Sequence, residues 1–402
     1  MTVKKDVDRI LAEKGLDSML FYSESYQNAN MYYLSGFKAP DPFIFLKRVG
    51  EDPLMIVNQM ELSRAKKEAG VKDVRSYHDY NFMQIVRSAP DPKVGGMKFV
   101  ASVANKELGT RKPIFVAPSF PTMLGDVLRS EDLKIKPVFD VVEKARETKE
   151  PEEIKAIKYV QKTMEEATSK AIELVANAEV GANGTLFCRE GGKRKQLLVG
   201  RVRSVFDHTF VDRGCVSEGE TIIARGPGGA DPHYTGKAED ILKADQPIVM
   251  DVFPRSVGNR YFSDMTRTVV KGRASKPVRK MFEAVLEARN AALDAIRAGV
   301  LGSKMQNLCY DVLEKAGYET IRGGKQISKG YTHGLGHGVG LEVHEGPSMG
   351  ELAKSPLEEH NIVTVEPGLY DPKIGGMRIE DIVEVTKKGC NDLTKMEICL
   401  EV

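Results

Sequence analysis

The sequence contains no tryptophan, only five cysteines and no long run of apolar residues. No stretch reaches the roughly 18 apolar residues that a membrane-spanning helix needs, so we expect no association with a membrane. Residues 1–20 mix charged and apolar side chains and lack the unbroken apolar core of a signal peptide. We therefore predict a soluble, cytoplasmic protein.

Cysteine is odd in number as well as scarce, and no pair has the Cys-x-x-Cys spacing of a redox or zinc motif. All the cysteines lie in the C-terminal part of the chain, at Cys188, Cys215, Cys309, Cys390 and Cys399. We predict that they are reduced thiols with a mostly structural role.

Neither sign of charge is in excess, because 59 basic residues nearly balance 57 acidic ones and leave a net charge of +2. This balance gives no electrostatic reason to expect a nucleic-acid partner. A local basic cluster does occur, and we predict that it forms a solvated loop. Its members are Arg189, Lys193, Arg194 and Lys195.

The length of 402 residues and the 41% hydrophobic content predict a large core and two domains. The N-terminal part alternates helical patterns with short apolar strands, which is typical of an α/β arrangement. These strands are expected at 18–22, 43–46 and 113–117. A charged segment then leads to Pro151, which suits the first turn of a helix. We place the domains at 1–145 and 146–402.

The second domain is predicted to combine helices with buried strands. Apolar residues at helical spacing predict helices at 154–175, at 277–298 ending before Gly299, and at 304–315 ending before Gly317. Runs rich in valine, isoleucine and methionine predict buried strands at 247–253, 361–366 and 377–385.

Five residues in and beside these strands are the candidate metal ligands. They are Asp251, Asp264, His337, Glu366 and Glu380. A carboxylate in a buried strand must be neutralised by a cation or a metal. Four carboxylates and one neutral imidazole carry a formal charge of minus four, which two divalent ions would cancel. One arginine could not do so.

The types of ligand atom indicate which metal ions would bind and which reaction they would catalyse. Oxygen ligands with a single nitrogen and no thiolate suit manganese or cobalt better than a structural zinc site, with zinc or iron as alternatives. Two ions that share carboxylates can hold a water as hydroxide and polarise a carbonyl for attack. The sequence therefore predicts metal-dependent hydrolysis.

A glycine-rich string at 334–340 surrounds His337. It fails the dinucleotide pattern G-x-G-x-x-G because position 339 is valine. His333 and His337 are four apart, a helical metal-binding spacing, but the glycines between and after them oppose a helix. We therefore expect only one of the two histidines to be a ligand.

The five strings around these residues resemble the metallopeptidase family of the pita-bread fold, and most closely its proline-specific branch. The closest strings are Gly336–Glu345, Val365–Gly368 and Gly376–Asp381. The resemblance implies an α+β chain, with a C-terminal pita-bread (creatinase/aminopeptidase-like) domain preceded by a smaller α/β creatinase-type domain. It covers essentially the whole chain, strongly from about residue 220 onward and loosely before residue 145.

One departure concerns the two aspartates, which are thirteen positions apart, two more than is usual in the family. We expect the additional residues to lengthen a hairpin turn at 256–259, since Gly258 and Asn259 favour turns. An addition of two keeps the alternation of the strand, so Asp251 and Asp264 should still face the same way.

The resemblance also implies roles. Asp251 and Asp264 would bind a first ion, Asp264 and Glu380 would bridge, and His337 with Glu366 would bind a second. Glu366 would also accept the proton of the attacking water. His233 and His344 match positions that contact the substrate and steady the tetrahedral intermediate.

Arg378 stands two residues before Glu380, so both side chains should project from one face of a strand. The resemblance implies that its guanidinium grips the carboxylate of a C-terminal proline. The alternative is that it supports a metal-bound carboxylate.

The predicted activity is hydrolysis of the bond before proline in dipeptides or short peptides. The alternatives are an aminopeptidase that acts on longer peptides, and a relative of the same fold without peptidase activity. The N-terminal domain is expected to help close the site within a homodimer.

Overall fold

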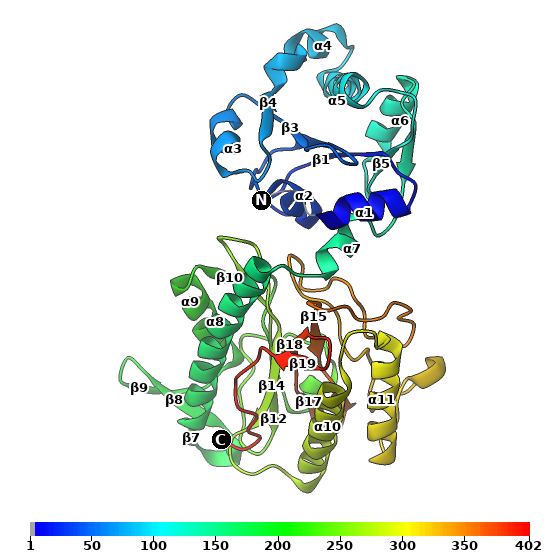
Figure 1. Cartoon of the computed structure of the whole chain (residues 1–402). Helices are drawn as coiled ribbons and strands as arrows, with labels where there is room; N and C mark the ends of the chain where they lie inside the picture. The colour runs from blue at the N-terminus through cyan, green and yellow to red at the C-terminus, as the bar shows by residue number, and fades with distance from the viewer. Residues whose placement is uncertain (1–4) are drawn as a thin grey trace. The chain divides into compact units, whose positions relative to one another are not determined.

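The computed structural model describes residues 5–402 of the chain, which divides into two compact units, Met1–Arg146 and Glu147–Val402 (Figure 1). The predicted boundary at 145/146 lies one residue before this division. Each unit has its own hydrophobic clusters, so each is described by itself.

The N-terminal unit is built on a six-stranded mixed sheet in the order β4-β3-β2-β1-β5-β6. Its strands are β1 (Ser18–Ser23), β2 (Phe43–Arg48), β3 (Leu54–Val57), β4 (Asp73–Ser76), β5 (Ile114–Val116) and β6 (Ile135–Pro137). Its helices are α1 (Lys5–Glu13), α2 (Ala29–Ser35), α3 (Leu62–Glu68), α4 (Phe82–Ser88), α5 (Pro92–Leu108), α6 (Thr122–Ser130) and α7 (Val142–Glu147). The α/β arrangement predicted for this part is therefore present.

Both faces of this sheet are covered, which explains why its central strands are almost continuously apolar. Successive side chains of a strand point to opposite faces. Phe21 and Phe45 accordingly pack into the cluster that includes α1 and α2 residues. Leu20 and Ile44 pack into the cluster formed with α5 and α6.

The second unit contains several small antiparallel sheets, and two three-stranded sheets form its central part. The first has the order β11-β12-β14 and the second has the order β15-β18-β19. Their strands are β11 (Ile222–Arg225), β12 (Pro247–Val252), β14 (Met265–Val270), β15 (Ile362–Val365), β18 (Asp381–Val385) and β19 (Cys390–Asp392). The hairpin of β16 (Gly368–Asp371) and β17 (Gly375–Arg378) lies beside them.

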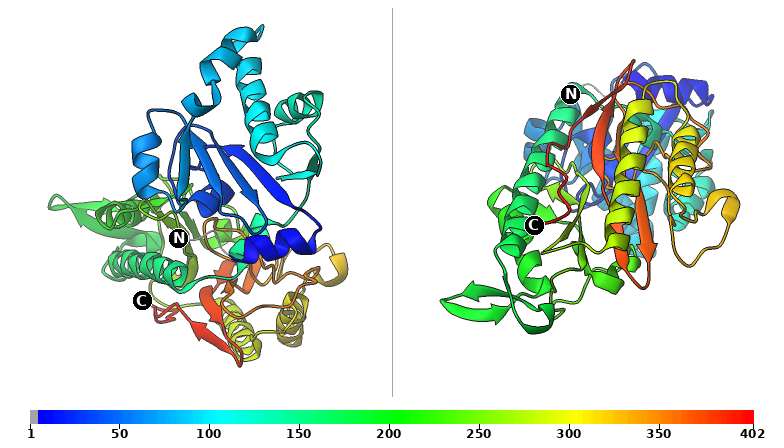
Figure 2. Two further views of the ribbon diagram at one scale, coloured as in Figure 1. Left: turned by 45° about the horizontal axis from the view of Figure 1, so that its top comes forward. Right: turned by 90° about the horizontal axis from the view of Figure 1, so that it is seen from below.

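Each of these two sheets has its own pair of helices (Figures 1 and 2). The pair α8 (Pro151–Ala176) and α9 (Val199–Asp212) shares a hydrophobic cluster with β12 and β14. The pair α10 (Lys276–Ala295) and α11 (Gly302–Lys315) shares another with β15, β17 and β18. The three predicted helices correspond to α8, α10 and α11, although α10 ends three residues earlier than predicted.

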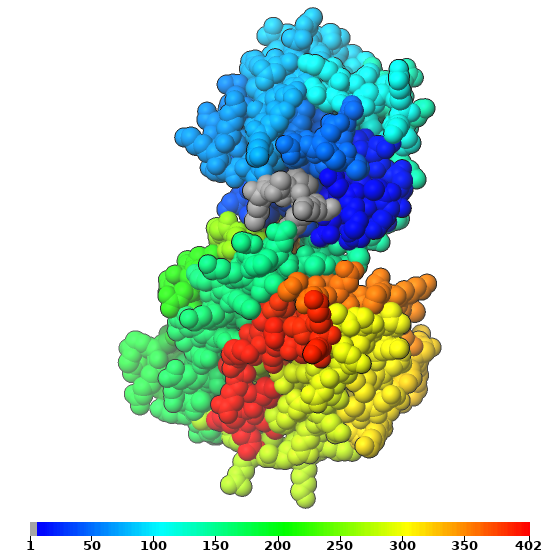
Figure 3. Space-filling model, viewed as in Figure 1, coloured from blue at the N-terminus to red at the C-terminus, as the bar shows by residue number. Residues whose placement is uncertain are grey.

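The ends of these helices follow local sequence signals. Pro151 occupies the first turn of α8, where its missing N–H costs nothing, and Glu150 and Glu153 form a capping box. The Ser275 side chain accepts a hydrogen bond from the Val278 N–H at the start of α10. The C-terminal residues run over the surface between α8 and α10 (Figure 3), where Glu401 accepts a hydrogen bond from the Ala274 N–H.

Two sequence-based predictions need correction. The strand expected at 377–385 is interrupted at Ile379 and Glu380, which separate β17 from β18. The basic cluster forms a hairpin of β8 (Leu186–Glu190) and β9 (Lys193–Gln196) instead of a loop. Its charges are paired, because Arg194 contacts Glu179 and Lys195 contacts Glu190, each at 2.9 Å.

All five cysteines are free thiols, as predicted. Cys188, Cys215 and Cys309 are buried, and burial raises the pKa of each of these thiols. Within residues 5–402, no helix combines the length and the apolar character that crossing a bilayer would require.

Candidate metal centre

Every residue predicted for the site lines a single cavity of about 180 Å³ in the second unit. These residues are Asp251, Asp264, His337, Glu366, Glu380, His233, His344 and Arg378. Ile222, Pro232, Phe253 and Val343 complete the lining. Residues more than 140 positions apart in sequence therefore meet in one place, while their roles stay predictions.

The pairing of β12 with β14 brings the two aspartates together. Asp251 lies opposite Thr266 in this antiparallel pair, and Asp264 lies two residues before Thr266. The segment between the two aspartates contains β13 (Pro254–Ser256), which pairs with β10 (Cys215–Ser217). The Arg260 N–H closes the turn on the Ser256 carbonyl at 2.9 Å. The longer turn thus lies where it was predicted.

The Thr266 hydroxyl connects three of the predicted residues. It lies 2.7 Å from Glu380 Oε2 and 3.2 Å from Asp251 Oδ1, and it accepts a hydrogen bond of 2.9 Å from Arg378 Nε. Arg378 and Glu380 therefore do reach the same place, as their spacing predicted. Thr266 is 0% exposed, and the sequence analysis did not single it out.

Two arginines, Arg267 and Arg289, hold the chain at Glu380 and Asp381. Arg267 donates to the Glu380 carbonyl at 2.8 Å and to Asp381 Oδ1 at 2.7 Å. Arg289 Nε donates to the other oxygen of Asp381 at 2.5 Å. Asp381 is completely buried, and these two partners compensate its charge. The break between β17 and β18 is thereby held in one conformation, with the Glu380 carboxylate in the cavity.

The glycine-rich string places His337 beside β15. The Thr364 N–H donates to the His337 carbonyl at 2.8 Å, and the His337 N–H donates to the Thr364 hydroxyl at 3.1 Å. Gly336 and Gly338 are needed here because a Cβ at either position would collide with backbone carbonyls. The glycines thus serve close backbone packing and not nucleotide binding.

The His337 ring is oriented toward the carboxylates. Its Nδ1 lies 3.1 Å from the Gly338 carbonyl, which leaves Nε2 at 3.2 Å from Glu366 Oε1 and 3.7 Å from Asp264 Oδ2. Ligand atoms of Asp264, His337 and Glu380 all lie within 4.8 Å of one another. His333 does not line the cavity, because its ring bonds to the Tyr370 hydroxyl at 2.9 Å. Of the two histidines, only His337 therefore lines the cavity, and its role as a ligand stays a prediction.

The electrostatics of the cluster indicate a deficit of positive charge. Burial, together with the neighbouring carboxylates, raises the pKa of Asp264 and of Glu380 well above the usual values. Burial alone would lower the pKa of His337, but its hydrogen bond with Glu366 and the charges of Glu366 and Glu380 raise it to about 9. In the absence of a metal ion, bound protons therefore neutralise part of the negative charge of the carboxylates.

Glu366 differs from the other carboxylates of the cluster. Burial would raise its pKa, but the hydrogen bond with His337 and the charges of His333, His337 and Arg378 lower it to about 2. Glu366 is therefore ionised at neutral pH, as a residue that accepts a proton must be.

The residues fit a divalent cation. Asp264 Oδ1 is buried and has no hydrogen-bond partner among residues 5–402, which is costly for a carboxylate oxygen unless a cation contacts it. The donors are carboxylate oxygens and one imidazole nitrogen, the set preferred by manganese and similar ions. The Gly338 carbonyl and the Thr266 hydroxyl orient the ligands in the way that outer contacts of metal sites do.

Tyr370 is a second residue that the sequence analysis missed. Its hydroxyl contacts His333 and accepts a hydrogen bond of 3.1 Å from Arg378 Nη1. Arg378 also binds Asp251 through Nη2. The sequence offered one signal for Tyr370. In β16, strand alternation directs Tyr370 to the same face as Gly368, two residues earlier.

A set of four carboxylates and one imidazole, buried or half-buried on a framework of helix-covered antiparallel sheets, is typical of a metal-dependent hydrolase. Residues 155–387 match the model of Metallopeptidase family M24, and residues 4–148 match that of the Creatinase/Prolidase N-terminal domain. The chain therefore belongs to metallopeptidase family M24. This finding confirms the predicted family and fold class, and it identifies the protein as a peptidase.

Named relatives cover nearly the whole chain. An Xaa-Pro dipeptidase of Pyrococcus furiosus is 28% identical over 92% of this chain and 91% of the relative. The crystal structure of the prolidase from Pyrococcus horikoshii has a TM-score of 0.75 at 26% identity, over 98% of this chain and 99% of that one. The crystal structure of an X-Pro aminopeptidase from Thermotoga maritima has a TM-score of 0.74 at 26% identity, over 98% of this chain and 100% of that one.

Proposed function

We propose that the protein is a metal-dependent Xaa-Pro peptidase that hydrolyses the bond before proline in dipeptides or short peptides. The observation that carries the proposal is the cavity in which five metal-ligand candidates lie beside His233 and His344. The names of relatives that cover almost the whole chain support the substrate class.

We assign each residue of the cavity a role in binding metal, accepting a proton or binding the substrate. Asp251 and Asp264 would hold one divalent ion, His337 and Glu366 would hold a second, and Asp264 and Glu380 would be shared by the two. When bound, manganese or cobalt activates a water molecule and polarises the carbonyl of the scissile bond. A carboxylate oxygen of Glu366 accepts the proton of that water. His233 and His344, both exposed at the cavity, donate hydrogen bonds to the substrate oxygens.

A small recessed site suits proline. The bond before proline is a tertiary amide without an N–H, so a peptidase cannot bind it as an ordinary strand. A cavity of about 180 Å³ instead admits the end of a short peptide. The first test is hydrolysis of Met-Pro against Met-Ala. A preference for Met-Pro supports the proposal, and faster cleavage of Met-Ala refutes it.

Arg378 is the one arginine or lysine that lines this cavity among the described residues. Its three nitrogens bond to Thr266, Tyr370 and Asp251. Burial alone would lower its pKa, but the charge of Asp251 helps to keep the guanidinium protonated. This geometry favours the role of support for Asp251 over that of a clamp for the substrate carboxylate. It therefore also favours the second candidate, an Xaa-Pro aminopeptidase that accepts longer peptides.

We expect the Arg378→Lys variant to lose metal affinity by about 10-fold to 100-fold, because a lysine cannot bond to three groups at once. The variant should lose kcat/KM equally for Met-Pro and for the amide of Met-Pro. Metal titration and initial rates measure the two effects. A loss confined to Met-Pro, whose carboxylate the amide lacks, would instead establish the clamp.

Phe253 is a feature of the longer hairpin. It lies two residues after Asp251, where strand alternation directs it to the same side, and it lines the cavity with Ile222 and Val343. We expect Phe253→Ala to raise kcat/KM for Phe-Pro relative to Ala-Pro by about tenfold, because it enlarges the pocket. Phe253→Leu serves as the matched control with a smaller effect. An unchanged ratio would exclude Phe253 from specificity.

The assembly and the role of the N-terminal unit belong to the same proposal. We expect a homodimer in which this unit helps to close the site, as the family resemblance implies. Sedimentation of the full chain measures the assembly. A monomer that retains full activity would show that dimer formation is not required.

A further inference from the structure

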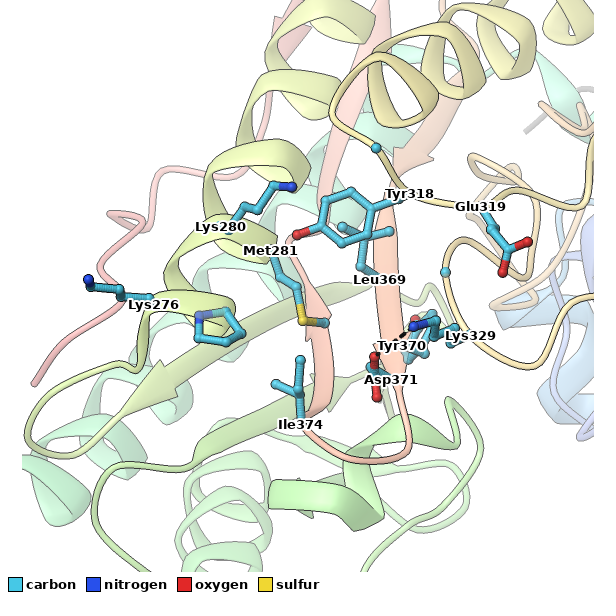
Figure 4. Close-up of a pocket in the computed structure, with 13 residues that line it drawn as sticks. Lys276, Lys280, Met281, Tyr318, Glu319, Lys329, Leu369, Tyr370, Asp371 and Ile374 are labelled. Carbon is cyan, nitrogen blue, oxygen red and sulfur yellow. Dashed lines mark ion pairs between the residues drawn. The ribbon is translucent and has the colours of Figure 1, made fainter.

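A second cavity, of about 440 Å³, lies in the catalytic unit (Figure 4). The start of α10, the segment 317–319, residues 329–330, β16 and Ile374 form its walls. The lining residues described for it include none of those of the metal cavity. Its volume falls within the roughly 300–1,000 Å³ of small-molecule sites, whereas the catalytic cavity is smaller.

The floor of this cavity is apolar. Met281 and Leu369 are 3% and 0% exposed, and Ile374 is partly buried beside them. In Figure 4 Met281 and Leu369 lie between Lys280 and Asp371, and Ile374 lies below them. Pro277, Tyr318 and Ile374 keep apolar surface exposed to the cavity. A ligand with an aliphatic body would cover that surface.

The Lys280 ammonium group stands at one end of this floor. Its Nζ lies 5.4 Å from the centroid of the Tyr318 ring, and Figure 4 places the Tyr318 hydroxyl on the same side. Among residues 5–402, no carboxylate lies within ion-pair distance of Lys280. Apart from Lys276, the other charged lining residues are paired, because Lys329 lies 3.9 Å from Asp371 and Glu319 lies 3.1 Å from Lys325.

The helix adds to this positive charge. The N-terminus of α10 carries the positive end of the helix dipole, which usually attracts acidic residues. The first turn of α10 has no acidic residue and contains Lys276. Among residues 5–402, Lys276 and Lys280 therefore have no ion-pair partner, and a bound anion would supply one.

We propose that this cavity binds a small organic carboxylate with an unbranched apolar body. The carboxylate accepts hydrogen bonds from Lys280 Nζ and the Tyr318 hydroxyl, and the aliphatic chain lies against Pro277 and Ile374. A simple aliphatic acid and an apolar amino acid share this chemistry. An amino acid would in addition place its ammonium group near Asp371.

Calorimetric titration of hexanoate into the metal-loaded protein tests the proposal. We expect saturable binding that Lys280→Glu weakens by about tenfold or more. Lys304→Glu, an exposed lysine at the start of α11, should leave the affinity unchanged. Hexanoate that bound at the metal centre would be insensitive to Lys280→Glu, and this result, like an absence of saturable binding, would overturn the proposal.

Two further probes identify the source of the ligand. Norleucine that binds more tightly than hexanoate supports an amino acid, and norleucine that binds more weakly supports a simple aliphatic acid. Hexylamine has the same body with the opposite charge and should not bind. Equal affinity for hexylamine and hexanoate would contradict the role given to Lys280.

Discussion

Replacing Asp264 with asparagine is expected to lower the rate of Xaa-Pro hydrolysis by about a thousandfold or more. The carboxylate is assigned to both ions, and an amide cannot bridge two cations as an anion does. Metal content per protomer should fall in parallel. Initial rates with Met-Pro and elemental analysis of the dialysed protein measure the two effects.

The loss in Asp264→Asn should not come from misfolding. Asp264 is 4% exposed and its Oδ1 has no hydrogen-bond partner among the described residues, so without metal the charge destabilises the fold. The metal-free variant should therefore unfold at the same temperature as the metal-free wild type or higher. Asp212→Asn, an exposed position at the end of α9, is the matched control. Normal rates with full metal content in Asp264→Asn would mean that the site is misplaced.

Removal of metal should abolish turnover and lower the unfolding temperature, and the difference should widen as pH rises. Without metal, burial and neighbouring carboxylates raise the pKa of Asp264 and Glu380 in the folded state. The folded protein then holds protons that the unfolded chain releases above about pH 4. The stability linked to these groups is present below that pH and is lost as pH rises toward the raised folded pKa.

His337 acts in the same direction, because its folded pKa of about 9 lies above the usual value. Its contribution is present below about pH 6.5 and is lost as pH rises through 9. Bound metal prefers the deprotonated ligands and so stabilises the fold more at higher pH. Thermal unfolding of stripped and reloaded protein at about pH 6 and about pH 8 measures the difference. A difference that narrows with pH would contradict this account.

Part of the candidate site could be predicted from the sequence because some of its residues sit in or beside apolar strands. Asp251 follows the run 247–250, and Glu366 follows 361–365, so each carboxylate had to face a compensating charge. The thirteen-residue spacing kept strand alternation, and Asp251 and Asp264 do line the same cavity. The full set of five residues came from the family resemblance, and their binding of metal stays a prediction.

The remaining contacts depend on tertiary packing, which local pattern does not encode. The partners of Arg378 are Asp251 in β12, Thr266 in β14 and Tyr370 in β16. Their spacing in the sequence does not predict that they meet at one guanidinium. The apolar run 377–385 predicted one strand, yet Glu380 turns between two sheets because its backbone N–H bonds to the Thr266 carbonyl at 3.1 Å. The basic cluster was predicted as a loop because Glu179, which pairs with Arg194, lies fifteen residues away.

The most direct test of the account is hydrolysis of Met-Pro and Met-Pro-Gly by protein that has been stripped with a chelator and then reloaded with manganese or cobalt. The account predicts no cleavage by the stripped protein and cleavage before proline once metal is restored. Cleavage of Met-Pro alone would identify a dipeptidase, and cleavage of Met-Pro-Gly an aminopeptidase. Failure to cleave either peptide at full metal content would contradict the account.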